Sequence, residues 1–153
     1  MVDRIFSALN PLIRWILRSP LHRLLSTGLM LITVTGRRTG RAYTFPVGYQ
    51  RDGETLVVMV SEARRKSWWR NFREPGVVEL RVRGRELRGR AELIAPDSAE
   101  FRQRAETSFR RMPWLGRVFG IDTTRRNGLS DAQVAHLGET AAIVRIGLDT
   151  AAD

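Results

Sequence analysis

The residues best suited to chemistry lie in a short turn rich in arginine, Gly36–Arg41 (GRRTGR). Its two glycines allow a tight turn with outward backbone N–H groups, which is the arrangement of an anion-binding nest. Thr39 adds a hydroxyl donor, and Arg37, Arg38 and Arg41 add forked donors suited to phosphate or carboxylate oxygens. The residues leave two interpretations open, an anion site or a hairpin turn with solvated arginines.

A second segment, Arg64–Phe72 (RRKSWWRNF), combines cations, two tryptophans and an amide. On a helix, Trp68 and Phe72 share one face and should point into the core. Trp69 then lies on another face, and Asn71 presents its amide near the same helix. This combination suits a flat, polar, anionic ligand; the alternative is that both tryptophans only pack against the rest of the protein.

The sequence contains few residues that could form other kinds of catalytic or metal site. The only histidines, His22 and His136, each lie in an apolar helical pattern, and the absence of cysteine argues against a structural zinc site. No serine lies in a strained turn that could serve a histidine-based triad. The sequence is therefore typical of a protein that holds a cofactor and lets the cofactor supply the chemistry.

Three β-branched, apolar runs surround these two segments and predict strands. Pro46 lies inside the second run, and because proline donates no ladder hydrogen bond it marks an edge, a bulge or the approach of a ligand. Asp52-Gly53 predicts a tight hairpin turn. The predicted strands are 29–35, 42–51 and 54–61.

The remainder predicts a mainly β protein with flanking helices. Charged and apolar residues alternate after Pro75-Gly76, which indicates a hairpin about Gly84 with one face in water. Asp97 should cap the next helix, and Ser130 a later one. The expected elements are helices over 63–74, 97–112, 117–121 and 130–137, and strands over 77–83, 86–94 and 140–148. Six short strands joined by tight turns favour a small, mostly antiparallel barrel.

The chain of 153 residues fits a single domain, which we expect to span residues 1–153. Its formal net charge of +10 predicts attraction to an anionic partner such as nucleic acid, an acidic membrane face or a polyanionic small molecule. Nucleic acid is disfavoured because the aromatic residues are not interleaved with arginine along one strand face. The absence of cysteine excludes disulfides and suits a cytoplasmic location.

Residues 1–26 have a helical apolar pattern with arginines between the apolar positions. No run reaches the roughly 18 apolar residues of a membrane span, and no secretory cleavage site is evident. Two interpretations remain. The segment packs on the core, or its basic apolar face makes peripheral contact with an anionic membrane, which would place the protein at the inner face of the plasma membrane.

The order of these motifs resembles the deazaflavin-dependent nitroreductase family. TGRRTGR, a strand with proline (TFPVGY), RDG, a strand ending in serine and WWRNF follow one another between residues 29 and 94. Members of that family are split β-barrel flavin/deazaflavin oxidoreductases, also called quinone reductases. The resemblance therefore implies a split barrel with residues 29–94 as its core, covered by helical residues 97–139 and completed by a last strand at 140–148.

The resemblance also implies the deazaflavin coenzyme F-420, whose phosphodiester and glutamate tail is polyanionic. Position by position, Arg37, Arg38 and Thr39 would hold the phosphate and tail, with Arg41 close by and Lys66 reaching toward the tail. The residues implied to lie at the deazaflavin ring are Pro46, Val47 and Gly48 through their backbone, Ser61 at the ring edge, and Trp68 and Asn71 on the covering helix.

The hypothesis is hydride transfer from reduced F-420 to an apolar acceptor, which could be a quinone, an enone or a nitroaromatic. The nitroimidazole-reducing members carry tyrosines over the substrate pocket, whereas residues 97–139 contain none. The expected pocket residues are Tyr49, Trp69, Phe109 and Trp114. Tyr49 and Ser61 can be proposed as proton donors, but no catalytic residue is assigned. The alternatives are an FMN-binding barrel and a carrier that binds the coenzyme without turnover, and the oligomeric state stays open.

Overall fold

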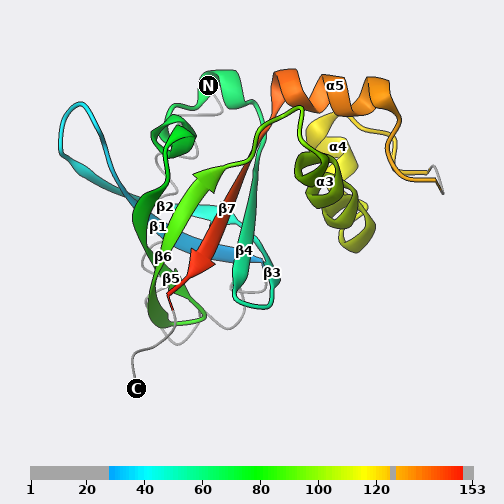
Figure 1. Cartoon of the computed structure of the whole chain (residues 1–153). Helices are drawn as coiled ribbons and strands as arrows, with labels where there is room; N and C mark the ends of the chain where they lie inside the picture. Colours follow the sequence, from blue (N-terminus) through cyan, green and yellow to red (C-terminus); the bar gives the residue numbers. More distant parts are fainter. Residues whose placement is uncertain (1–27, 125–126, 150–153) are drawn as a thin grey trace.

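The computed structural model describes residues 28–124 and 127–149 (Figure 1). Within them, seven strands form one antiparallel sheet in the order β2-β1-β5-β6-β7-β4-β3. The sheet curls into a half-barrel, which confirms the expected mainly β, split-barrel class. The strands are β1 Leu29–Thr35, β2 Ala42–Gly48, β3 Gln50–Asp52, β4 Thr55–Val60, β5 Gly76–Val82, β6 Arg85–Leu93 and β7 Ala142–Leu148.

The expected number of six strands was wrong, because the run over 42–51 breaks at Tyr49. Its backbone N–H leaves the ladder and donates to the carbonyl of Gly28 at 2.9 Å. β2 and β3 therefore lie at opposite ends of the strand order although one residue separates them. Two ends of a sheet can be joined by so short a link only if the sheet curls back on itself, so Tyr49 marks the seam of the half-barrel.

The inside of the curl is an apolar core to which every strand except β3 contributes. Alternate residues point inward, as in Met30, Ile32 and Val34 of β1, which are at most 2% exposed. Val78 and Leu80 of β5 lie against them, while the charged residues between face outward. The period-two pattern of β5 and β6 thus has the wet outer face that the sequence predicted.

A second apolar cluster lies outside the curl, between β4, β7 and the helices α3 Ala99–Arg111, α4 Leu115–Phe119 and α5 Asp131–Thr140 (Figure 1). One face of α3 packs into this cluster through Phe101, Ala105 and Phe109, as expected from their spacing. The cap of α3 differs from the prediction: the Ser98 hydroxyl, and not Asp97, accepts from the N–H of Phe101 at 3.1 Å.

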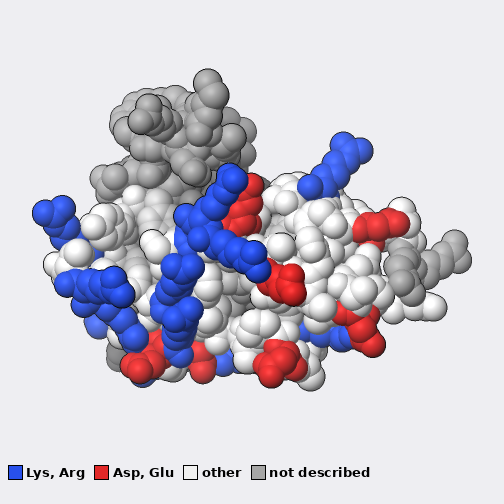
Figure 2. All heavy atoms as spheres, turned by 90° about the horizontal axis from the view of Figure 1, so that it is seen from above, with Lys and Arg blue, Asp and Glu red and all other residues white. Residues whose placement is uncertain are grey.

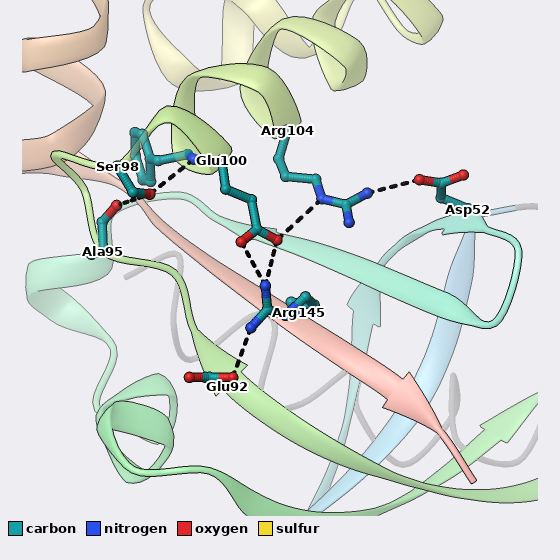
Figure 3. A network of polar contacts seen from close by, with 8 residues as sticks. Asp52, Glu92, Ala95, Ser98, Glu100, Arg104 and Arg145 are labelled. Carbon is teal, nitrogen blue, oxygen red and sulfur yellow. Dashed lines mark hydrogen bonds and ion pairs between the residues drawn. The ribbon is translucent and has the colours of Figure 1, made fainter.

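Arg145 of β7 ties α3 to the sheet through a chain of ion pairs (Figure 3). Its guanidinium donates to Glu100 of α3 at 2.6 Å and to Glu92 of β6 at 2.7 Å. The hydrogen bond to Glu100, and then the one to Glu92, raise the pKa of Arg145 above its already high usual value. Arg104 extends the network to Asp52 beside the β3–β4 turn at 2.9 Å. The network therefore anchors α3 at a fixed position on the outer face.

The helix expected over 63–74 was wrong in type. Two short 3-10 segments replace it, η1 Ala63–Arg65 and η2 Trp68–Arg73, separated where Lys66 is extended. A segment this short cannot repay the cost of nucleating an α-helix. Pro75 also disfavours helical geometry in the residue before it, and Glu74 is extended.

Two turns differ slightly from the predicted positions. The first hairpin turn is Gly53-Glu54, because Asp52 still pairs with Thr55. The second is Arg83-Gly84, where both residues have positive φ, as a tight turn matched to sheet twist requires.

The prediction for residues 1–26 lies outside the described residues. No helix in 28–124 or 127–149 is long and apolar enough to cross a membrane.

Candidate functional site

The arginine turn caps the β1–β2 hairpin, which projects from the sheet (Figure 1). Half of its N–H groups are engaged within the turn: Gly36 donates to the Arg41 carbonyl at 2.8 Å, Gly40 to the Gly36 carbonyl at 2.9 Å, and Arg41 to the Thr39 hydroxyl at 3.3 Å. Of the six N–H groups of the turn, only those of Arg38 and Thr39 have no partner among the described residues. Fewer backbone donors are therefore open to an anion than the sequence suggested, and those that remain lie at the tip of the turn.

Asn71 joins this turn to η2. Its side-chain oxygen accepts from the backbone N–H of Arg37 at 3.3 Å, and its side-chain nitrogen donates to the carbonyl of Trp68 at 2.9 Å. The Arg37 side chain forms an ion pair with Glu74 at 3.1 Å just after η2. The turn and the aromatic segment, 34 residues apart in sequence at Arg37 and Asn71, thus form one continuous surface.

Both tryptophans of η2 are half-buried. Trp68 packs on Phe45 of β2, with ring centroids 5.3 Å apart, and on Phe72 at 6.2 Å. The expected neighbourhood of Trp68 and Phe72 is therefore present although the helix is not α. Trp69 donates its indole N–H to the Ala63 carbonyl at 2.9 Å.

Two guanidinium groups cover the Trp69 ring. Arg70 and Arg73 lie 5.3 and 5.9 Å from its centroid. Such cation–π contacts hold the arginines at the surface of η2. Trp69 therefore supports the positive surface here, and its face toward these arginines is already occupied.

The predicted ring-contacting residues are divided between the two faces of β2. Val47 points into the apolar core, Pro46 alternates to the other face, and Gly48 is exposed at the end of the strand. β2 is an edge strand, as Pro46 indicated, with β1 as its only partner among the described strands. The other edge of its backbone pairs with no strand of the described residues.

Ser61 and Lys66 lie together at the end of β4. The Lys66 ammonium donates to the Ser61 hydroxyl at 3.4 Å, and both residues are half-buried. Tyr49, the other proposed hydroxyl, is buried in the core with 8% of its surface exposed.

Positive charge gathers around the arginine turn and the two 3-10 segments. Figure 2 shows Lys and Arg covering the side of the molecule where the β1–β2 turn lies, with acidic groups more frequent toward α3–α5. The turn and the two 3-10 segments contain no acid; Glu62 comes directly before η1 and Glu74 directly after η2. The exposed arginines are Arg37, Arg38, Arg41, Arg64, Arg65, Arg70 and Arg73.

A groove of about 570 Å³ crosses the outer face of β1, β2, β5 and β6. Its polar lining is mixed in charge: Thr33 of β1, Thr44 of β2, Glu79 and Arg81 of β5, and Glu86 and Arg88 of β6, beside Leu31 of β1. The hydroxyls of Thr33 and Thr44 are hydrogen-bonded at 2.8 Å. Leu31 pairs directly with Pro46, so the predicted proline borders the groove. The volume lies in the usual range for small-molecule sites.

The structure does not bring Phe109 and Trp114 to this surface. Phe109 is buried against Phe119 in the cluster beneath α3, with ring centroids 5.9 Å apart. Trp114 is 62% exposed at the start of α4. A second hollow of about 510 Å³ lies beside α3, lined in part by Glu106 and Asp122. It is separate from the residues of the arginine turn.

Sequence reasoning missed Phe45 and Thr44. Strand alternation could have placed Phe45 on the inner face, but its contact with Trp68 depends on where η2 crosses the barrel. No group of three or more His, Cys, Asp or Glu residues that could hold a metal ion occurs in the described part of the chain.

Comparisons with known proteins bear on the family and on the fold. The family model for F-420H(2)-dependent quinone reductase matches residues 19–112, more than half of the chain. No curated protein matches the sequence.

Several solved structures share the fold. An F-420-H2 dependent reductase (FDR-A) is 14% identical with a TM-score of 0.54, over 78% of this chain and 94% of that one. An FAD-binding protein from Mesorhizobium loti is 14% identical with a TM-score of 0.51, over 86% and 89%. An FAD and heme binding protein from Mycobacterium smegmatis is 18% identical with a TM-score of 0.50, over 86% and 67%. At these identities the likeness shows the fold alone.

Proposed function

Because this chain belongs to the F-420H(2)-dependent quinone reductase family, we propose that it reduces an apolar acceptor with a hydride supplied by the reduced deazaflavin, a quinone being the first candidate. Enones and nitroaromatics are the other acceptors that such a hydride could reduce. A quinone that takes up a hydride also needs one proton to become a hydroquinone.

The observation that carries the proposal is the link made by Asn71. It holds the arginine turn against the half-buried Trp68 and Phe45, so that anion donors and an aromatic wall belong to one surface. A cofactor with a flat ring and a polyanionic tail needs both. The residues therefore fit the deazaflavin coenzyme.

Each part of the surface has a distinct task in this proposal. The side chains of Arg37, Arg38 and Arg41 and the free N–H groups at the tip of the turn bind phosphate and carboxylate oxygens. Trp68 excludes water from one side of the ring, and the free edge of β2 at residues 46–48 offers backbone groups to its polar rim. These contacts orient the ring and lower the entropic cost of the transfer.

Ser61 is the better-placed proton donor of the two hydroxyls. It is half-exposed at the strand end and accepts a hydrogen bond from Lys66, whereas Tyr49 is buried in the core. The lysine ammonium can replace the proton that the hydroxyl gives up. Substitution of Ser61 by alanine should therefore lower kcat more than it lowers coenzyme affinity.

The test is a binding titration of the purified protein with oxidised F-420 and, separately, with FMN. Arg38→Ala and Trp68→Ala should each weaken F-420 binding by roughly tenfold, the cost of one charge-assisted hydrogen bond or one ring contact. Arg90→Ala is the matched control because Arg90 is also exposed but lies on the outer face of β6.

The outcomes separate the possible functions. F-420 binding followed by quinone-dependent loss of reduced F-420 absorbance supports the reductase. Binding without turnover of quinone, enone or nitroaromatic acceptors would instead indicate a carrier. Tight FMN binding without F-420 binding would contradict the proposal and favour the flavin alternative.

A further inference from the structure

Helix α4 exposes an unusual pair of hydrophobic side chains. Trp114 is 62% exposed and Val118 is 51% exposed, although most large apolar residues of the described chain are buried. They are four residues apart and so lie on the same side of the helix. The opposite side is buried through Gly116 and Phe119.

The packing of α4 fixes this exposure. Phe119 packs edge-on against Phe109, and the N–H of Ile121 donates to the Gly116 carbonyl at 2.8 Å. The approach is so close that a Cβ added at Gly116 would lie 2.5 Å from the Ile121 carbonyl oxygen. The helix therefore cannot rotate to bury Trp114 without losing its own contacts.

Three exposed arginines lie close in sequence to the apolar pair: Arg110 and Arg111 at the end of α3, and Arg117 within α4. None of them forms an ion pair with a described residue. Arg111 donates to the Arg51 carbonyl at 3.0 Å, which leaves its charge uncompensated. The acids nearest in sequence, Glu106 and Asp122, both line the hollow that Arg110 also lines.

We propose that this α3–α4 corner, residues 110–118, docks on the surface of an anionic lipid bilayer. Tryptophan favours the level of the lipid headgroups, where its ring is in an apolar layer and its N–H remains hydrogen-bonded. Arginines beside it bind the phosphates of anionic lipids, and Val118 adds apolar area.

Charge favours a membrane over a second copy of the chain as the occupant. A two-fold interface through this corner would place the same patch on both subunits, so that three arginines faced three arginines. Like charges opposed in this way cost binding energy. An anionic bilayer instead matches both the charge and the apolar centre.

The experiment measures co-sedimentation of the full chain with vesicles of phosphatidylcholine and phosphatidylglycerol, compared with phosphatidylcholine alone. Arg117→Ala should weaken binding to the anionic vesicles by about fivefold, the effect of one basic residue at such a surface. Arg90→Ala, which removes an exposed arginine elsewhere, should have less effect. Val118→Ser should weaken binding, whereas Val77→Ser, which alters a side chain also 51% exposed, should not.

Brominated lipids give an independent readout, because they quench only tryptophans close to the acyl chains. Quenching of the wild-type emission should fall in Trp114→Phe. Equal quenching in both proteins, or equal binding of all four variants, would overturn the proposal and assign the contact to another surface. Dimerisation in solution that Val118→Ser abolishes would also overturn it, in favour of a second copy.

Discussion

Asn71 has the largest organising effect of any single residue at the site. One side-chain amide satisfies a donor on the arginine turn and an acceptor on η2, which are separate elements. Aspartate would retain the acceptor for the Arg37 N–H but would lose the donor to Trp68. It would also place a negative charge beside the free donors of the turn.

We therefore predict that Asn71→Asp weakens binding of oxidised F-420 more than Asn71→Ala does. A carboxylate a few ångströms from bound phosphate should lower affinity by roughly tenfold at moderate ionic strength. The measurement is a fluorescence titration of both variants. Equal affinities would show that Asn71 only shapes the turn and that no anion binds beside it.

At the scale of elements, α3 depends on a charged contact as well as on its apolar face. Arg145 lies between Glu100 and Glu92, each about one-third to one-half exposed. Without the arginine, Glu92 would lose its partner and Glu100 would keep only Arg104, at 3.6 Å, while the two carboxylates would still face each other. The two ion pairs of Arg145 should therefore stabilise the fold by an amount between that of an exposed pair and that of a fully buried pair.

We predict that Arg145→Ala lowers the free energy of unfolding by about 1–3 kcal/mol. The control Arg90→Ala should change it by less than about 0.5 kcal/mol. Adding Glu100→Gln to Arg145→Ala should recover part of the loss, because it removes the repulsion. Denaturant unfolding measures the free energy of unfolding of all three variants. If the losses from Arg145→Ala and Glu100→Gln simply add in the double variant, the two residues do not interact and the proposed network is contradicted.

The pH dependence of this contact follows from the raised pKa of Arg145. A raised folded-state pKa adds stability that is present in full below the unfolded value and is lost only as the pH rises through the folded value. Both values lie far above neutrality, so the arginine's contribution should be constant across neutral pH.

At the scale of the whole molecule, the net charge of +10 is distributed unevenly. The turn and the 3-10 segments are basic, whereas the carboxylates of the Arg145 network neutralise part of the charge near α3 (Figures 2 and 3). This asymmetry should draw an anionic coenzyme toward the predicted site rather than to the surface at large.

We predict a salt-dependent affinity. Raising the ionic strength from about 0.05 M to about 0.5 M shortens the screening length severalfold and should weaken F-420 binding on the order of tenfold. A deazaflavin ring without phosphate and tail should bind more weakly and with little salt dependence. If both ligands respond equally to salt, the arginine turn does not bind the tail.

The sequence was informative wherever local pattern decides structure. The β-branched run 29–35 forms β1 with the expected bounds, the alternation after Gly76 gives the two-faced hairpin, and Ser130 caps α5 through its hydroxyl. It was less informative where tertiary contacts compete with local preference. The segment 63–74 has helical periodicity, yet Trp69 bonds to the Ala63 carbonyl and the chain adopts 3-10 turns.

The sequence by itself determined most of the strands, the basic turn, and the motif order that resembles the family, because these depend on residues close along the chain. Only the tertiary structure decided which of them meet. In the folded chain Asn71 accepts a hydrogen bond from Arg37, and Phe45 packs on Trp68. Phe109 lies in the apolar cluster beneath the helices and Trp114 at the start of α4, both away from the arginine turn. The physical reason is that the sheet curls back on itself at Tyr49. The curl brings residues that are distant in sequence into contact, and a local sequence pattern does not predict such contacts.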